Sequence, residues 1–208
     1  MALDRNQLSE VAPLLRRVVA LDASSLARLR RNGDRLSALV RLPFGVLAAR
    51  TLDEPGSDFD VTVRSDELLA WLDGERTEPP QARDADWRGS VPPVAGWRRV
   101  DIVPDSQIRP LVRSGALTLK EAAEREGVPG ASPRAEVADA LLDSVVLTVR
   151  SDTDSARITL RTVSAVTRLG FLPRNSHVAV DVSGRWIRVA AAYGSVFAEQ
   201  EAPALTLR

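Results

Sequence analysis

Apolar residues recur at helical spacing near the start of the chain, at Leu8, Val11, Leu15, Val18 and Val19. Residues three and four positions apart lie on one face of an α-helix, so this spacing predicts an amphipathic helix over roughly residues 8–21. Proline lacks the amide hydrogen and clashes with the preceding turn. Pro13 therefore belongs in the first turn of this helix or kinks it.

The pattern then changes to one that predicts β-strands. Residues 25–31 and 35–42 flank Asn32-Gly33, a pair that favours the positive φ angles of a tight hairpin turn. Residues 59–63 alternate in polarity and predict another strand. Ser65 follows this strand and is the expected N-cap of a short helix.

The segment from Gly74 to Gly96 is the expected boundary between two domains, 1–90 and 91–208. Its two Pro-Pro pairs resist regular secondary structure. Exposed indole rings are unfavourable, so Trp87 and Trp97 indicate a segment that packs across a surface rather than a freely moving linker.

The second half of the chain predicts helices followed by a terminal hairpin. The expected helices cover residues 106–114, 117–126, 133–147 and 158–169. Residues 177–182 and 185–192 flank Ser183-Gly184 and predict a β-hairpin. Strands and helices in both halves predict an α+β fold of two small lobes that mix antiparallel strands and helices.

The composition limits the available chemistry. The 208 residues include one histidine, His177, and no cysteine, and the 28 basic residues are one lysine, Lys120, and 27 arginines. Histidine, cysteine and lysine are among the side chains that enzymes use most for nucleophilic and proton-transfer steps. Our leading interpretation is therefore a non-catalytic binding or protein-interaction protein, with no catalytic residues and no cofactor.

Charge is unevenly distributed, although the chain as a whole has a net charge of zero. Residues 1–50 contain nine arginines and four acidic residues, whereas residues 51–90 contain four arginines and eleven acidic residues. Neighbouring segments that neutralise each other on the folded surface would explain this pattern, and so would self-association through complementary patches. We favour the first explanation.

One acidic pattern suggests metal chemistry. Asp58 and Asp60 lie two positions apart on a predicted strand, where alternate side chains share a face, and Asp101 lies inside a later apolar strand. Convergence of the three carboxylates would provide the oxygen ligands that Mg²⁺ prefers. The alternative is that Asp58 and Asp60 lie on the solvent face of an edge strand.

This spacing resembles the minimal nucleotidyltransferases of the polymerase-β type. In that family a Phe-Gly-Ser turn precedes a Ser-Asp-x-Asp strand, and this chain contains Phe44-Gly45 and Ser57-Asp58-Phe59-Asp60. The resemblance implies a Mg²⁺-dependent nucleotidyltransferase that uses Asp58, Asp60 and Asp101. Val46 stands where the family has a serine. The resemblance therefore also fits an inactive relative of that family.

Two further stretches resemble known domains. Residues 60–69 are similar to the strand–helix unit of sterol-carrier-type domains, which implies a small apolar-ligand carrier as a further alternative. Residues 117–128 resemble the first helix and turn of helix-turn-helix DNA-binding proteins. The following helix contains Glu136, Asp139 and Asp143, and because acidic side chains oppose phosphate, we expect no nucleic acid partner.

In composition and in its short sequence phrases, the chain resembles uncharacterised proteins of high-GC actinobacteria, and this resemblance implies no activity. Its apolar runs are shorter than the ~18 residues that span a bilayer. We therefore expect a cytoplasmic protein without a membrane partner that binds another protein or a second copy of itself.

Overall fold

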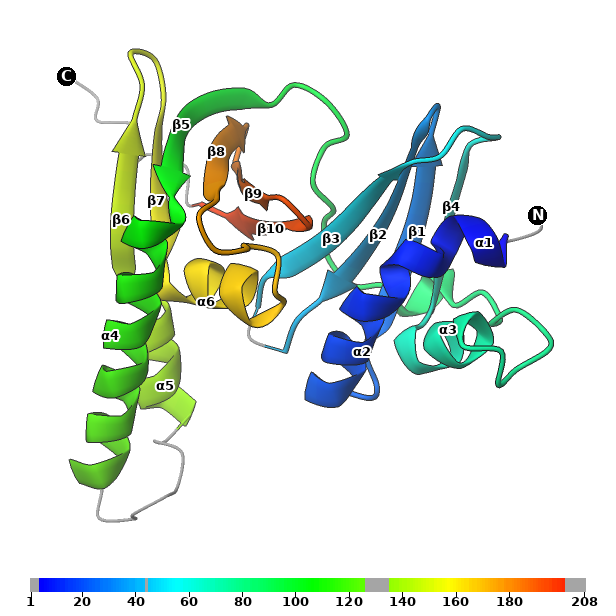
Figure 1. Ribbon diagram of the computed structural model, residues 1–208, viewed down its shortest axis with the longest axis horizontal. Coiled ribbons are helices and arrows are strands. Elements are labelled where there is room, and N and C mark those ends of the chain that lie inside the picture. The colour runs from blue at the N-terminus through cyan, green and yellow to red at the C-terminus, as the bar shows by residue number, and fades with distance from the viewer. Residues whose placement is uncertain (1–3, 44, 126–134, 201–208) are drawn as a thin grey trace. The chain divides into compact units, whose positions relative to one another are not determined.

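The structure is a computed structural model that describes residues 4–43, 45–125 and 135–200 (Figure 1). It divides into two compact units, unit 1 with residues 1–94 and unit 2 with residues 95–208. Each unit combines helices with antiparallel strands, which confirms the expected α+β fold. Within the described residues, no helix has both the length and the apolar character needed to cross a membrane.

Unit 1 contains a four-stranded antiparallel sheet in the order β4-β1-β2-β3. Its elements are α1 (Arg5–Leu8), the 3-10 turn η1 (Ser9–Val11), α2 (Ala12–Leu21), β1 (Leu26–Asn32), β2 (Arg35–Arg41), β3 (Leu47–Asp53), β4 (Phe59–Arg64), α3 (Ser65–Leu72) and the 3-10 turn η2 (Asp84–Asp86). Pro13 lies in the first turn of α2, as predicted. Gly33 has a φ of 57° between β1 and β2, which confirms the predicted hairpin.

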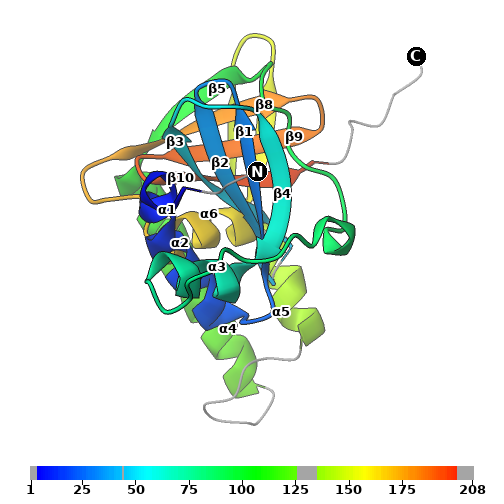
Figure 2. The same ribbon diagram turned by 90° about the vertical axis from the view of Figure 1, so that its right-hand side faces the viewer.

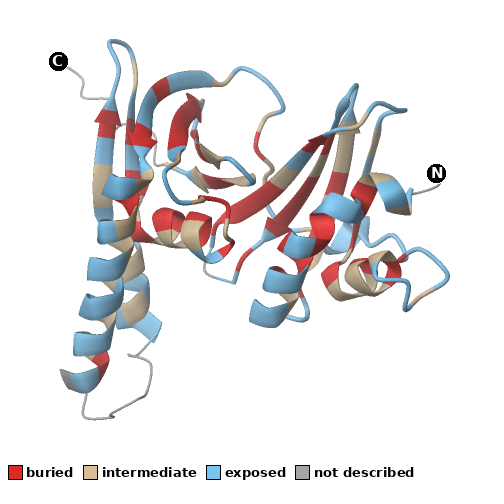
Figure 3. Ribbon diagram, viewed as in Figure 1, coloured by how far each residue is buried: buried red, intermediate tan, exposed pale blue. Residues whose placement is uncertain are grey.

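The core of unit 1 lies between its helices and one face of the sheet (Figures 2 and 3). Helix α2 buries Leu15 and Val18, and α3 buries Leu68. Alternate residues of β1, Ala27 and Leu29, are fully buried. Removing these apolar side chains from water provides the main driving force for packing the helices on the sheet.

The expected cap of α3 is wrong. Ser65 is the first residue of the helix rather than its N-cap, which is Arg64. The Ser65 amide donates to the Ser25 carbonyl oxygen at 3.0 Å, and the Ser65 side chain is fully buried. Tertiary packing against the start of β1 has therefore displaced the serine from the capping position that its residue type favours.

Ion pairs within unit 1 join the arginine-rich first 50 residues to the acidic residues that follow. Arg16 lies 2.5 Å from Asp73, and Arg28 lies 2.6 Å from Asp60. These pairs show neighbouring segments that neutralise each other on the folded surface, the explanation favoured from the sequence.

Unit 2 contains a second antiparallel sheet of four strands in the order β10-β9-β8-β5, and a separate hairpin of β6 and β7. Its elements are β5 (Arg98–Pro104), α4 (Asp105–Arg125), α5 (Ala135–Leu142), β6 (Val145–Arg150), β7 (Ser155–Thr159), α6 (Leu160–Arg168), β8 (His177–Ser183), β9 (Trp186–Ala191) and β10 (Gly194–Glu199). The strands β8 and β9 confirm the predicted terminal hairpin.

The helices of unit 2 differ from the prediction in two places. One continuous helix, α4, replaces the two expected at 106–114 and 117–126. A Cβ atom on Gly115 would lie 2.5 Å from Leu160, so this glycine, inside the continuous helix, lets α6 approach α4 closely. The hairpin β6–β7 includes residues 145–147 and 158–159, which the sequence predicts as the ends of two helices. The expected break at 127–132 lies outside the described residues.

The two units share one topology, in which a helix leads into three consecutive antiparallel strands. These segments are α2-β1-β2-β3 in unit 1 and α6-β8-β9-β10 in unit 2. In each unit a fourth strand, β4 or β5, pairs antiparallel with the first of the three and continues into a helix. The additional elements of unit 2 are α5, β6 and β7.

The sheet of unit 2 has a buried carboxylate, that of Asp181. Its side chain lies on the opposite face of the sheet from the side chain of Val180. Asp181 is 2% exposed and accepts hydrogen bonds from Arg99 and from Arg188, the latter at 3.0 Å. The Arg188 guanidinium stacks over Trp97 at 4.5 Å. Two cations therefore compensate one buried anion, and an aromatic ring covers one of them.

We predict that Asp181→Ala lowers the free energy of unfolding by about 3 kcal/mol, because it leaves Arg188 partly buried without its anion. Urea denaturation measures this change. The matched control is Asp101→Ala, an exposed aspartate of the same unit, for which we expect a change below about 0.5 kcal/mol. Equal effects of the two substitutions would contradict the role assigned to Asp181.

Candidate functional site

The face of the unit 1 sheet opposite the helices carries charged side chains. Because side chains alternate along β1, Arg28 and Arg30 lie on this face while Leu29 faces the core. Arg28 donates two hydrogen bonds to Asp60, at 2.6 and 2.8 Å, and Arg30 lies 3.4 Å from the same carboxylate. The sequence alternation that builds the core thus also places an ion cluster on the opposite face.

The segment after α3 covers the outer side of edge strand β4. The Thr62 amide donates to the Asp84 carboxylate at 2.6 Å, and the Arg83 amide donates to the Thr62 carbonyl oxygen at 2.7 Å. Thr62 is consequently only 1% exposed. These bonds satisfy backbone groups of an edge strand that would otherwise be free to pair with another chain.

Trp87 attaches this segment to the sheet. The guanidinium carbons of Arg28 and Arg41 lie 5.7 and 6.0 Å from its ring centroid, within the range of cation–π contacts. Gly89 has a φ of 89°, and a Cβ atom there would lie 2.9 Å from Arg41 Nη2. The segment therefore packs directly on Arg41, as the tryptophan in the sequence indicated.

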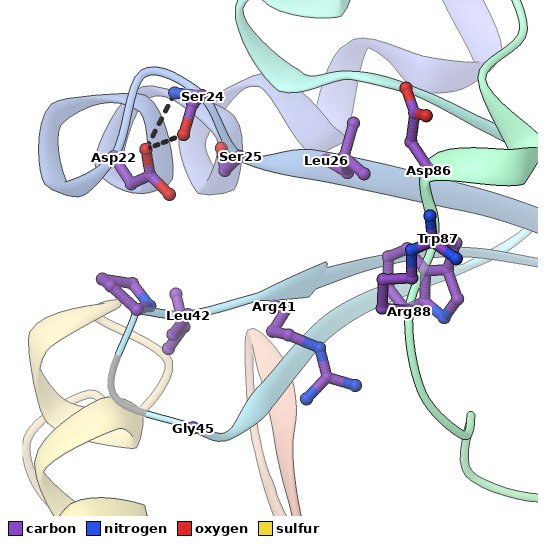
Figure 4. Close-up of a pocket in the computed structure, with 11 residues that line it drawn as sticks. Asp22, Ser24, Ser25, Leu26, Arg41, Leu42, Gly45, Asp86, Trp87 and Arg88 are labelled. Carbon is purple, nitrogen blue, oxygen red and sulfur yellow. Dashed lines mark hydrogen bonds between the residues drawn. The ribbon is translucent and has the colours of Figure 1, made fainter.

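Beside Trp87 the unit 1 surface contains a cleft of about 390 Å³ (Figure 4). Three segments form it: the end of α2 and start of β1, the turn between β2 and β3, and the residues around Trp87. The lining residues are Asp22, Ser24, Ser25, Leu26, Arg41, Leu42, Pro43, Gly45, Asp86, Trp87 and Arg88. Its volume falls in the range of small-molecule binding sites.

The acidic groups of this cleft already have partners. Asp22 accepts hydrogen bonds from the Ser24 amide at 2.8 Å and the Ser24 hydroxyl at 2.6 Å. These bonds stabilise the ionised form and hold the pKa of Asp22 below its usual value. Asp86 lies 3.7 Å from the Arg83 guanidinium.

The donors of the cleft are less well satisfied. Among the described residues, neither Arg41 nor Arg88 has a carboxylate within 4.0 Å. Two buried polar atoms, Ser25 Oγ and Trp87 Nε1, have no hydrogen-bond partner within the same part of the chain. A buried polar group without a partner costs about 1–3 kcal/mol. The cleft therefore offers several donors to a ligand that brings acceptors.

The structure assigns protein partners to the aspartates singled out as metal ligands. The Asp58 carboxylate accepts from the Gly33 amide at 2.8 Å, and Asp60 binds Arg28 and Arg30. Asp101 belongs to unit 2, where it accepts from the Ile102 amide. Residues 4–43, 45–125 and 135–200 contain no group of three or more acidic or histidine side chains arranged to hold a metal ion.

Sequence reasoning missed the residues that line the cleft. The resemblance to nucleotidyltransferases predicts a phosphate-binding turn at Phe44 and Gly45. Phe44 lies outside the described residues, and Gly45 lines the cleft. The feature of the sequence that could have identified the cleft was Trp87, a large aromatic residue in a segment rich in proline and charged residues. No local pattern indicated that Arg41 and Arg88 would line the same cleft.

The sequence matches two family models. Residues 92–203 match the domain of unknown function DUF8185, and residues 1–89 match the domain of unknown function DUF8010. The sequence matches no curated protein.

Solved structures of bacterial sliding clamps have a similar fold. The DNA polymerase III subunit beta from Pseudomonas aeruginosa superimposes with a TM-score of 0.58 and 13% identity over 97% of this chain and 64% of the clamp. The sliding clamp from Caulobacter crescentus gives a TM-score of 0.54 and 12% identity over 98% and 66%. The Helicobacter pylori beta clamp gives 0.56 and 11% over 97% and 65%. The chain spans just under two thirds of these clamps, and the likeness concerns the fold alone.

We predict that Trp87→Ala releases the segment from the sheet and speeds trypsin cleavage after Arg83 and Arg88 about tenfold. The half-buried ring and its two arginine contacts contribute about 1–2 kcal/mol to holding the segment closed. Limited proteolysis followed by mass spectrometry measures both sites. The control is Val94→Ala, an exposed position farther along the same stretch. Unchanged cleavage in Trp87→Ala would show that the ring does not hold the segment.

Proposed function

The chain belongs to the family of the domain of unknown function DUF8185, and from its geometry we propose that it is a non-catalytic cytoplasmic binding protein that holds a segment of a partner protein in the cleft of unit 1. The observation that carries this proposal is the cleft itself. It combines apolar side chains with hydrogen-bond donors that have no partner among the described residues. Such a combination is typical of binding sites, where polar groups fix the orientation of a ligand on an apolar surface.

The chemistry of the lining residues supports binding rather than catalysis. Among the described residues, no histidine, lysine or cysteine lines the cleft, and its two aspartates lie beside Ser24 and Arg83. No histidine among the lining residues is available as a general base for Ser24. The cleft therefore lacks the nucleophile–base pair on which covalent catalysis depends.

The fold supports association with other proteins. The clamps with a similar fold are named as DNA polymerase sliding clamps or as a subunit of DNA polymerase III. At 10–13% identity, this chain need not share their partners. Its net charge of zero provides no overall attraction for phosphate backbones, so we propose a protein rather than DNA as the partner.

The described residues favour partner binding over the other two functions considered from the sequence. A carrier of small apolar ligands requires an apolar cavity, whereas four of the eleven lining residues are charged. A Mg²⁺-dependent nucleotidyltransferase requires carboxylates that are free to bind the metal, whereas Asp60 is engaged by Arg28 and Arg30. No observation favours either function over partner binding.

We test the proposal with a photo-reactive amino acid at Pro43, an exposed lining residue, in cells that contain the full chain. We expect a discrete protein adduct at Pro43 and none at Asp34, an exposed position in the β1–β2 turn. Mass spectrometry of the adduct identifies the segment bound. Absence of an adduct at Pro43, or a catalytic turnover abolished by one substitution in the cleft, would overturn the proposal.

A further inference from the structure

The inference concerns the chemistry of the bound segment and rests on the proposed function. We propose that the cleft of unit 1 takes an acidic peptide in extended conformation, with its carboxylates on Arg41 and Arg88 and its apolar side chains on the wall formed by Leu26 and Pro43.

The first argument is the charge of the available groups. The anions of the cleft are engaged, since Ser24 binds Asp22 and Arg83 lies beside Asp86. In the described part of the chain, Arg41 and Arg88 lack such counter-ions. A ligand therefore meets two cations and few open acceptors, which favours an anion.

The second argument is that Arg41 is held in place before a ligand arrives. Its guanidinium contacts the Trp87 ring at 6.0 Å and lies close enough to Gly89 to leave no room for a Cβ atom there. A guanidinium fork already fixed in position loses less conformational entropy when it binds a carboxylate. Arg41 is thus suited to a directed, two-pronged contact with a carboxylate.

The third argument is the set of buried polar atoms beside the arginines. The Trp87 indole N–H can only donate, and the Ser25 hydroxyl can donate or accept. A peptide supplies carbonyl oxygens as acceptors along its whole length, in addition to its acidic side chains. A free inorganic anion supplies acceptors but no apolar groups for the wall of Leu26 and Pro43.

An extended peptide matches this division of the cleft into two parts. Side chains alternate in direction along an extended chain, so every second residue faces the same side. A peptide that alternates leucine and glutamate therefore presents carboxylates to the arginines and apolar side chains to the wall. This alternation defines the probe for the experiment.

The experiment is isothermal titration calorimetry of the full chain with acetyl-Leu-Glu-Leu-Glu-Leu-amide, with the glutamine analogue as the neutral probe. We expect the acidic peptide to bind at least about tenfold more tightly than its analogue. The double substitution Arg41→Gln, Arg88→Gln should remove this preference. Arg35→Gln, at the opposite end of β2 and exposed, should keep it within about twofold.

Thermal unfolding of each variant shows whether the fold is retained, and single substitutions at Arg41 and Arg88 replace the double variant if it fails to fold. Equal binding of the two peptides overturns the inference, as does an acidic preference that survives loss of both arginines. Binding of hexanoate or inorganic phosphate as tight as that of the acidic peptide would assign the cleft to a small anion instead. An adduct at Pro43 on a segment without acidic residues would retain partner binding while contradicting this inference.

Discussion

The contact of Trp87 with Arg28 and Arg41 is the interaction on which the site of unit 1 depends. Arg28 is bound to Asp60 on the sheet, and the Trp87 ring contacts the Arg28 guanidinium. The hydrogen bonds of Thr62 with Asp84 and Arg83 hold the same segment on β4. The aromatic ring thus connects the ion cluster on the sheet to the geometry of the cleft.

The two units have similar clusters of charged side chains on their sheets. On each sheet an aspartate binds arginines: Asp60 binds Arg28, and Asp181 binds Arg99 and Arg188. A tryptophan then covers one arginine of each cluster. A buried or half-buried charge is tolerated only when it is paired, and covering the pair with an aromatic ring excludes water without removing the compensating charge. The two units therefore share this kind of cluster as well as their topology.

Local patterns predicted much of the fold. Asn32-Gly33 identified the first hairpin, and Pro13 marked the beginning of α2, because each residue type restricts the backbone directly. The predictions failed where tertiary contacts decide. The two helices expected at 106–114 and 117–126 form one, in which Gly115 allows close packing with Leu160, and the packing of Ser65 against Ser25 prevents Ser65 from acting as a cap.

The site was less predictable than the fold. Its residues lie up to 66 positions apart in the chain, and only folding brings Arg41 and Arg88 into the same cleft. Sequence reasoning instead selected Asp58, Asp60 and Asp101 by local spacing. Local spacing gives no information on which arginines will neutralise a carboxylate, and Asp60 has two of them as neighbours. The shared topology of the units was equally hidden, since β1 and β8 have different residues on the same framework.

The most direct test of this account is the NMR chemical shift of the Arg41 side-chain protons, measured in the wild-type chain and in Trp87→Leu. Protons over an aromatic face experience its ring current, so the account predicts upfield Arg41 signals that return to ordinary values when Trp87 is replaced. Ordinary Arg41 shifts in the wild-type chain would show that the ring and the guanidinium are not in contact. The cleft described for unit 1 would then lack the interaction that forms it.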